Sequence, residues 1–310
     1  MKKIFFCLVL TILSITTSIQ AQKKQPLFVL DLAASKYFKT LFSPYQFNIF
    51  EDKLFAFNDD AQWAVYNYST KKESIDNTFA IKGKSYDFFN ILFKNTNERV
   101  IANIRRIYFM DKNKLTSSLK FNVNIEHVVL LNGKYALVVL PILTPIRDDS
   151  GGSSIELIVY DGSKRLYSKK DVIGYVSTSF RDSKNVLSMV TDSPEGLTEY
   201  RYDTLTNTLV KSFYLYDENE SYLAYSNEKY VYCFEDDFTK LSVKKRKAQN
   251  ERLENVMTIP LKDYFPNLKA NPFDFTEGEP NFRMVEIKGK LHLVYLFNKK
   301  LYCYLLDVPN

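Results

Sequence analysis

Several residue types that enzyme active sites commonly need are scarce in this sequence of 310 residues, which has only 2 histidines, 3 cysteines and 9 glycines. So few glycines disfavour the loops that hold phosphate groups, because such loops need backbone conformations that other residues rarely adopt. The sequence also contains no G-x-S-x-G, H-E-x-x-H, C-x-x-C or G-x-x-x-x-G-K motif. The sequence therefore favours a protein without covalent chemistry over an enzyme.

The histidines and acidic residues do not form a pattern that is typical of a metal site. His127 and His292 both fall inside predicted strands, where a packed, hydrogen-bonded histidine is more common than a catalytic one. Asp148 and Asp149 precede two glycines, but they lack the alternating acidic residues of a calcium-binding EF-hand loop. With so few soft ligands, we predict no metal and no cofactor.

The charge balance is weakly positive, with 42 Lys and Arg against 36 Asp and Glu and a formal net charge of +6. An excess of this size does not require an anionic partner. The basic run at 244–247 could contact a phosphate or an anionic glycan, but a solvated hairpin end is the simpler interpretation.

The first residues have the pattern of an export signal. Lys2 and Lys3 form a charged segment, residues 4–15 are apolar, and a stretch of mostly small residues ends at Ala21. We predict cleavage near Ala21, which leaves a single domain at 22–310 in the periplasm or outside the cell. Export makes nucleic acid an improbable partner, and no later segment approaches the roughly 20 apolar residues that a spanning helix needs.

Two cysteines, Cys233 and Cys303, remain after this leader is removed. Export permits a disulfide bond between them. Two buried free thiols are the simpler expectation, because a disulfide requires Cα atoms within about 7 Å of each other.

The segment 125–171 has the pattern of a complete four-stranded antiparallel sheet. Residues 125–131 and 135–143 are apolar runs joined by an Asn-Gly pair, which is a strong signal for a tight hairpin. A polar loop leads to a third strand at 155–160, and an Asp-Gly pair leads to a shorter, more polar strand at 165–168. Apolar inner strands with a polar outer strand are typical of a propeller blade, whose inner strands are packed between neighbouring blades.

Similar sets of strands recur along the chain and predict an all-β, six-bladed β-propeller. The third strands of these sets begin at six positions with a spacing of about 40 to 60 residues: Gln62, Ile107, Ile155, Leu197, Thr239 and Leu301. The sixth set lacks its outer strand, whereas the apolar segment 26–32 has no partner nearby in the sequence. We therefore predict that this N-terminal strand completes the last blade, which would leave no open edge between the first and last blades.

The whole chain after the leader resembles the exported, TolB-like six-bladed β-propeller proteins that are common in Bacteroidetes. The leader that ends in Ala21-Gln22 looks like theirs. WD40 repeats fit less well, since Trp63 precedes Ala64 and is the only tryptophan. The resemblance is one of architecture, so no catalytic residue is carried over, and it implies binding of a ligand or partner outside the cytoplasm.

A ligand-binding site is predicted at the mouth of the central channel, on the face where the links between blades emerge. Tyrosines begin several predicted inner strands, and aromatic rings with hydroxyl groups suit a sugar or an extended peptide. Packing is the alternative explanation, because tyrosine is favoured in strands of any β protein. The predicted site comprises Tyr86, Tyr175, Tyr222, Arg283, Tyr45, Asp87, Glu126 and His127.

Three functions fit this fold. The favoured one is a non-catalytic binding protein whose ligand is a glycan, a peptide or an envelope protein. A hydrolase or lyase that acts on a glycan or an ester is the first alternative, and a structural subunit of an envelope assembly is the second.

Overall fold

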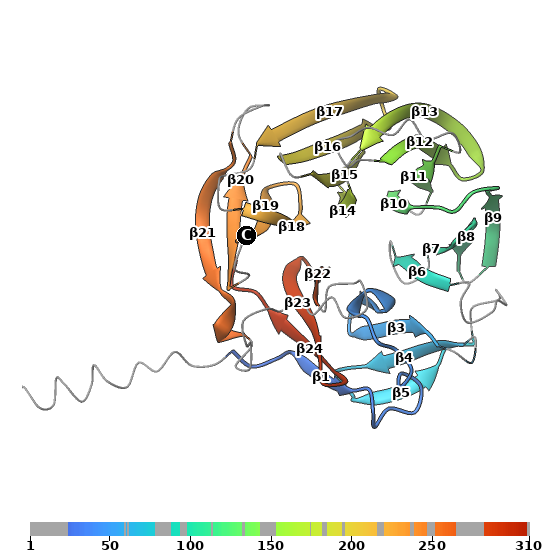
Figure 1. Ribbon diagram of the computed structural model, residues 1–310. Coiled ribbons are helices and arrows are strands. Elements are labelled where there is room, and N and C mark those ends of the chain that lie inside the picture. The colour runs from blue at the N-terminus through green and yellow to red at the C-terminus, as the bar shows by residue number, and fades with distance from the viewer. Residues whose placement is uncertain are drawn as a thin grey trace, which may run out of the picture.

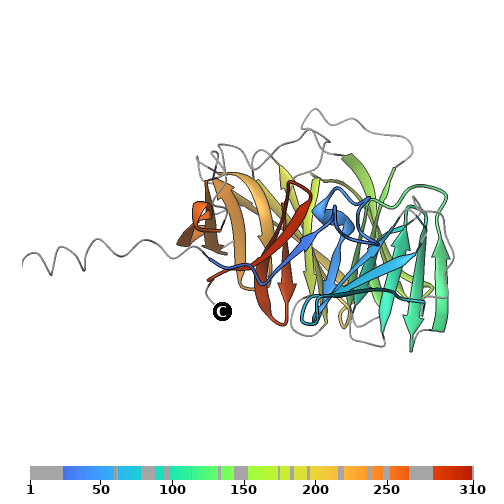
Figure 2. The ribbon, with the colours of Figure 1, turned by 90° about the horizontal axis from the view of Figure 1, so that it is seen from below.

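Six four-stranded antiparallel sheets form a closed ring in the computed structural model (Figure 1). The structure describes residues 24–58, 60, 62–77, 88–93, 98–112, 114–131, 134–142, 153–173, 175–181, 185–193, 196–215, 220–235, 239–246, 252–264 and 282–308. Seen from the side, the strands cross the thickness of the ring (Figure 2). The prediction of an all-β, six-bladed propeller is confirmed.

Each sheet is one blade, and its strands follow one another along the chain from the centre of the ring outward. Blade 1 contains β2 (Asn48–Phe50), β3 (Lys53–Phe57), β4 (Trp63–Asn67) and β5 (Lys72–Ile75). Blade 2 contains β6 (Phe88–Phe93), β7 (Arg99–Asn103), β8 (Arg106–Asp111) and β9 (Lys114–Lys120). Blade 3 contains β10 (His127–Leu131), β11 (Tyr135–Pro141), β12 (Ser153–Asp161) and β13 (Lys164–Ile173).

The other three blades repeat this order, except that the sixth takes its outer strand from the N-terminal part of the chain. Blade 4 contains β14 (Tyr175–Arg181), β15 (Val186–Ser193), β16 (Gly196–Asp203) and β17 (Thr208–Leu215). Blade 5 contains β18 (Glu220–Ser226), β19 (Tyr230–Glu235), β20 (Lys240–Lys245) and β21 (Glu254–Pro260). Blade 6 contains β22 (Phe282–Ile287), β23 (Lys290–Phe297), β24 (Lys300–Leu305) and β1 (Phe28–Asp31).

The hydrophobic core is divided into clusters that lie between neighbouring blades. Strand β11 shows why its sequence is apolar throughout: Val138 packs in the cluster shared with blade 2, whereas Val139 packs in the cluster shared with blade 4. Successive side chains of a strand point to opposite faces, so a strand between two blades needs apolar residues at every position. The outer strands face water on one side, and most of the residues of β9 and β21 are accordingly exposed.

The predicted closure of the ring by the N-terminal strand is confirmed. Strand β1 pairs antiparallel with β24, with Phe28 opposite Cys303 and Asp31 opposite Lys300. Phe28 is buried in the cluster between blades 6 and 1. An ion pair between Lys24 and Asp307 holds the flanking segments together beyond the strands.

Two boundaries differ from the sequence-based prediction. Tyr45 was among the tyrosines expected to begin an inner strand, but Pro44–Gln46 forms a short 3-10 helix, η1, and β2 begins only at Asn48. Proline lacks the N–H group that a strand ladder needs, so it favours a turn here. The outer strand of blade 3 is longer than the predicted 165–168, because β13 extends along the whole of β12, with Ile173 opposite Ser153.

Cys233 and Cys303 do not form a disulfide bond with each other, as the sequence favoured. Cys233 and Cys303 are both buried, and they belong to different hydrophobic clusters. Among the described residues, no helix is both long enough and apolar enough to cross a membrane.

Candidate functional site

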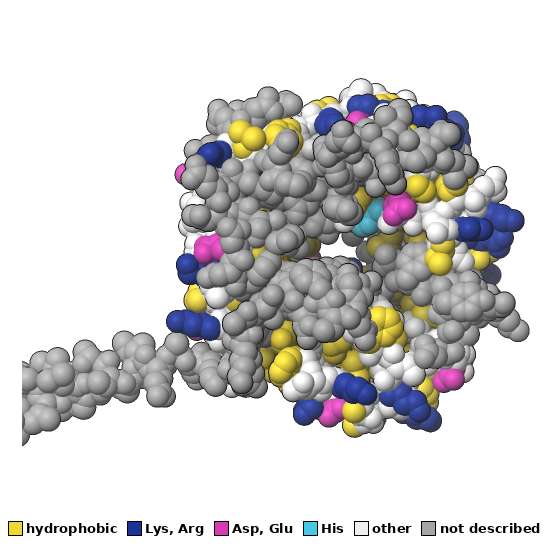
Figure 3. All heavy atoms as spheres, viewed as in Figure 1, with side chains coloured by type: hydrophobic (Ala, Val, Ile, Leu, Met, Phe, Trp, Pro, Cys, Tyr) yellow, Lys and Arg dark blue, Asp and Glu magenta, His cyan; other side chains and the backbone are white. Residues whose placement is uncertain are grey.

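The inner strands β2, β6, β10, β14, β18 and β22 surround the centre of the ring, where the space-filling view shows an opening (Figure 3). Each inner strand follows the link from the preceding blade, so its first residues lie at the end of the channel where these links emerge. We call this the link-side end. In the space-filling view, a histidine and an acidic side chain lie at the rim of the opening.

The predicted site residues are spread over several inner strands near the link-side end. His127 is the first residue of β10, Tyr175 is the first of β14, and Arg283 is the second of β22. Tyr222 is the third residue of β18 and Tyr45 lies in η1, so these two tyrosines do not begin strands as predicted.

The role of all four predicted tyrosines remains a prediction. The structure describes the backbone but not the side chains of Tyr45, Tyr175 and Tyr222. Tyr86 and Asp87 lie outside the described residues.

Arg283 is half-buried and bridges two blades. Its guanidinium Nη1 donates a hydrogen bond of 2.9 Å to the backbone carbonyl oxygen of Phe47, which precedes β2. Phe47 is itself buried, with 1% of its surface exposed. The charge of Arg283 also lowers the pKa of Tyr225 on β18, although burial raises that pKa more strongly. The guanidinium thus lies within reach of strands from both neighbouring blades.

His127 lies on the opposite side of the ring from Arg283, because blades 3 and 6 are three places apart among six. Its Nε2 atom is buried and has no hydrogen-bond partner among the described residues. Burial and, to a smaller extent, the positive charge of Arg283 together lower the pKa of the imidazole to about 4. The ring is therefore neutral near pH 7, and Arg283 acts on it across the channel.

Glu126 stands beside His127 and is exposed. Its backbone N–H donates a hydrogen bond of 2.9 Å to the carbonyl oxygen of Val139, which continues the pairing of β10 with β11. This bond fixes the backbone just before His127. The link-side end therefore combines a cation, a neutral imidazole and a carboxylate at its edge.

The other histidine has the packed role that its sequence context favoured. His292 is buried on β23, with 5% of its surface exposed, and its Nδ1 lies 2.8 Å from the carbonyl oxygen of Lys290. Burial lowers the pKa of His292 as well.

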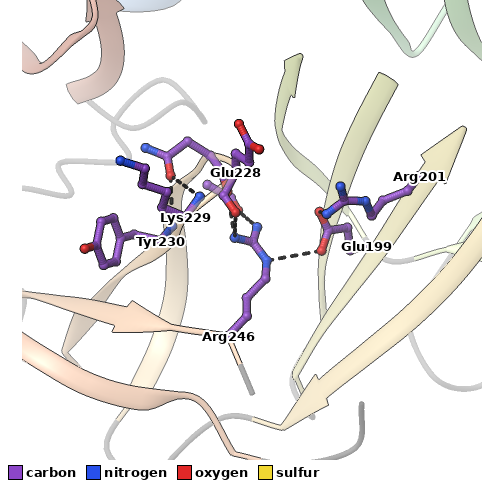
Figure 4. A network of polar contacts seen from close by, with 8 residues as sticks. Glu199, Arg201, Glu228, Lys229, Tyr230 and Arg246 are labelled. Atoms are coloured by element: carbon purple, nitrogen blue, oxygen red, sulfur yellow. Dashed lines mark hydrogen bonds and ion pairs between the residues drawn. The ribbon is translucent and has the colours of Figure 1, made fainter. Parts of the chain in front are cut away.

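A second polar cluster, which the sequence did not predict, lies between blades 4 and 5 (Figure 4). At its centre, Nε of Arg246 donates a hydrogen bond of 3.1 Å to Oε2 of Glu199 on β16. Nη1 of Arg246 donates a 2.6 Å hydrogen bond to the carbonyl oxygen of Asn227, and Nη2 donates to the hydroxyl of Ser226. Arg201 adds an ion pair of 3.7 Å to Oε1 of Glu199. We call this cluster the interblade network.

The carboxylate of this network is deeply buried. Glu199 has 1% of its surface exposed, and burial raises its pKa although Arg246 acts in the opposite direction. Strand alternation explains the position, since Leu197 lies two residues before it and packs in the cluster between blades 4 and 5. The sequence signal for this network was therefore Glu199 itself, a charged residue on the face of β16 that also carries the buried Leu197.

The interpretation of the basic run at 244–247 as a solvated hairpin end is wrong for two of its three described residues, Lys244 and Arg246. Lys244 is 2% exposed, and Arg246 is held in the interblade network. Leu241 and Val243 face blade 6, so the alternate positions of the same strand point toward blade 4. Lys245 is exposed. Of the three described basic residues, Lys244 is therefore buried and Arg246 joins two blades, and only Lys245 is exposed to solvent.

No group of three or more His, Cys, Asp or Glu side chains that could hold a metal ion occurs within the described ranges. Asp148 and Asp149, which the sequence analysis considered for calcium, lie outside these ranges.

The comparisons with known proteins concern the fold alone. No protein-family model matches the chain, and no curated protein matches it. The β-propeller domain of Cps50 (Swd1) from Myceliophteria thermophila is 12% identical, with a TM-score of 0.46, over 86% of this chain and 99% of that chain. Hsv2 from Kluyveromyces lactis is 11% identical, with a TM-score of 0.45, over 83% and 73% of the two chains. Luciferin-regenerating enzyme is 14% identical, with a TM-score of 0.49, over 91% and 95%. At these values, no functional argument rests on the three proteins.

Proposed function

We propose that this protein is an exported β-propeller that binds a ligand or a protein partner at the link-side end of its central channel, without covalent chemistry. The observation that carries the proposal is the position of Arg283 and His127 at the starts of inner strands in two opposite blades, both at the link-side end. Polar groups that converge from different blades on one opening are the usual means by which a pocket fixes the orientation of its ligand.

The ligand classes that suit this site are glycans, peptides and extended segments of envelope proteins. Each of them offers several hydrogen-bonding groups. The tyrosines predicted at the same end, Tyr175 and Tyr222, would add stacking area beside the polar groups.

Binding is favoured over catalysis because of the low basicity of His127. An efficient general base has a pKa near the operating pH, whereas burial lowers the pKa of His127 to about 4. At pH 7 the neutral imidazole can donate or accept a hydrogen bond. It is a weak base, however, because it takes up a second proton only near pH 4.

Arrays of glycans and peptides, probed with the chain 22–310, test the proposed binding. We expect at least one class to bind, and Arg283→Ala to weaken that binding. Lys134→Ala is the matched control, because it removes an exposed positive charge from a turn between a first and a second strand, at the other end of the blades. Turnover of a glycan, ester or lactone that is lost in His127→Ala would replace this proposal with a hydrolase or lyase.

Mass spectrometry of the protein from its native cell tests the export. The residues from Lys2 to Ala21 have the pattern of a cleaved leader. We expect a mature chain that begins at Gln22. A chain that retains Met1 would contradict export through this leader.

A further inference from the structure

We propose that this protein forms a dimer through β17, the outer strand of blade 4, which pairs antiparallel with β17 of a second copy. The two sheets of blade 4 would then join into one continuous sheet across the dimer. This inference concerns the rim of the ring and does not depend on the link-side end.

The first support is the open edge of blade 4. Strand β17 ends this sheet, and no described strand lies beyond it (Figure 1). It pairs with β16 over its whole length without a shift of register. Within the described ranges, the outward backbone groups of this edge make one isolated bridge, from Leu215 to Arg252 at the C-terminal end. The rest of the edge can therefore exchange hydrogen bonds with an added strand.

The second support is that β17 lacks the features that protect the other outer strands from such pairing. Charged side chains, proline, bulges and short length all serve this purpose. Strand β13 contains four basic residues, and β9 has a lysine at each end. Strand β21 ends in proline and is paired to β20 through a bulge, whereas β1 and β5 have four residues each. Strand β17 has eight residues with one lysine, no proline and no bulge.

The single lysine of β17 is directed toward a neighbouring blade. Nζ of Lys211 lies 3.5 Å from Oδ2 of Asp171 on β13 and 5.5 Å from the centre of the Tyr200 ring. Its charge thus has a partner in the same chain. It therefore repels a second copy less strongly than an unpaired lysine would.

The third support is the apolar surface along this strand. Val210 is 54% exposed and Leu215 is 38% exposed, and Leu205 in the preceding turn is 77% exposed. Leu209 and Tyr214 pack in the clusters shared with blade 3 and with blade 5, respectively. Packing on both faces holds the strand in place, which lowers the entropic cost of pairing. A second copy would cover apolar side chains that are now exposed.

The sequence of β17 suits pairing with itself. A two-fold axis between two antiparallel copies places one central residue opposite itself. The middle of the strand offers Lys211 and Ser212, and two lysines opposite each other would repel. With Ser212 on the axis, Val210 lies opposite Tyr214 of the second copy. Pairs of aromatic and β-branched residues stabilise antiparallel strands, so we infer this register.

Sedimentation of residues 22–310, which contain all six blades, measures the association. We expect a dimer that dissociates on dilution within about 1 to 100 µM, the range of a modest interface. Val210→Lys should raise the dissociation constant at least about tenfold, because it puts an unpaired charge between the two strands. Leu115→Lys is the matched control, since Leu115 is 49% exposed on the outer strand β9, and this variant should dimerise as before.

A cysteine on the axis tests the register. The native Cys233 and Cys303 are buried and should not react. Ser212→Cys should give a disulfide-linked dimer under mild oxidation, because Cα atoms directly opposite in an antiparallel pair are about 4.5 to 5.5 Å apart, within reach of a disulfide. Ser117→Cys replaces another half-buried serine, on β9, and should remain uncross-linked.

Three results would overturn the inference. A chain that stays monomeric at every concentration would exclude the dimer. A dimer that withstands Val210→Lys would place the interface elsewhere, and a dimer that does not cross-link through Ser212→Cys would refute the pairing of β17 with itself. Thermal unfolding of Val210→Lys and Leu115→Lys verifies that both variants keep the fold, so a lost dimer can be told apart from a lost fold.

Discussion

The interblade network and the link-side end each combine one arginine with one buried titratable side chain, yet they treat that side chain differently. Arg246 donates directly to Oε2 of Glu199 and also bonds to Ser226 and Asn227, while among the described residues Oε1 of Glu199 has only an ion pair of 3.7 Å to Arg201. Arg283 bonds to a backbone carbonyl instead, and Nε2 of His127 has no partner within the described ranges. The first arrangement joins two blades through side-chain hydrogen bonds, whereas the second leaves Nε2 of His127 without such a bond among the described residues.

If this contrast is correct, the largest loss of stability should come from the interblade network. Arg246→Ala leaves the carboxylate of Glu199 buried without its main partner, and breaking a buried pair in this way costs about 3 to 5 kcal/mol. We expect the free energy of unfolding in urea to fall by roughly this amount. Lys240→Ala is the control, because the Lys240–Glu235 pair is 3.1 Å long but Lys240 is 51% exposed. Exposed pairs of this kind contribute about 1 kcal/mol or less.

A double substitution distinguishes lost charge compensation from lost packing. Well-packed apolar residues often replace a buried ion pair at little cost. We therefore expect Glu199→Leu combined with Arg246→Leu to be more stable than Arg246→Ala alone. A double variant that is less stable than Arg246→Ala would show that the network contributes mainly through its shape and its hydrogen bonds to blade 5.

The second expected effect is a dependence of stability on pH that comes from His127. The pKa of His127 is about 4 in the folded chain and about 6.5 in an unfolded chain. Below pH 6.5 the unfolded chain therefore takes up a proton that the folded chain does not. The contribution of the neutral His127 to the free energy of unfolding is fully present above pH 6.5. It is lost as the pH decreases toward 4, by a total of about 3 kcal/mol.

Urea unfolding between pH 8 and pH 4 measures this dependence. His127→Phe cannot take up the proton, so the difference in stability between the variant and the original chain should change by about 3 kcal/mol over the range. A difference that is constant with pH would show that His127 is solvated and titrates normally.

The smallest expected effect on stability concerns Arg283. Arg283→Gln removes the hydrogen bond to Phe47 and should lower the free energy of unfolding by about 1 kcal/mol, much less than Arg246→Ala. It also removes a positive charge that disfavours protonation of His127. An NMR titration of the imidazole should therefore give a higher pKa for His127 in the variant. An unchanged pKa would mean that the two side chains do not interact across the channel.

The fold was predictable because its signals are repeated along the chain. Every blade needs apolar inner strands and short turns, so errors at single boundaries, such as Tyr45 in η1, leave the number of blades unchanged. The closure by β1 followed from a count of strands, since the sixth set had three strands and the chain had one unpaired apolar segment at its start.

The polar clusters were harder to predict because they depend on contacts between blades. His127 and Arg283 were named from their places near the start of inner strands, but nothing in the sequence indicated that Arg283 would bond to Phe47, 236 residues away. Lys244 and Arg246 were misjudged because a run of basic residues is usually solvated. The position of Glu199, in register with the buried Leu197, was the available clue.

The pairing of β1 with β24 has a consequence for the order in which the chain folds. During synthesis β1 is made before every blade, whereas β24 is made after all the others, so the last blade cannot be completed until nearly the whole chain exists. Contacts between segments so distant in sequence form slowly, because the loop between them must first be closed. An unfinished chain therefore leaves Phe28 and its neighbours accessible to proteases.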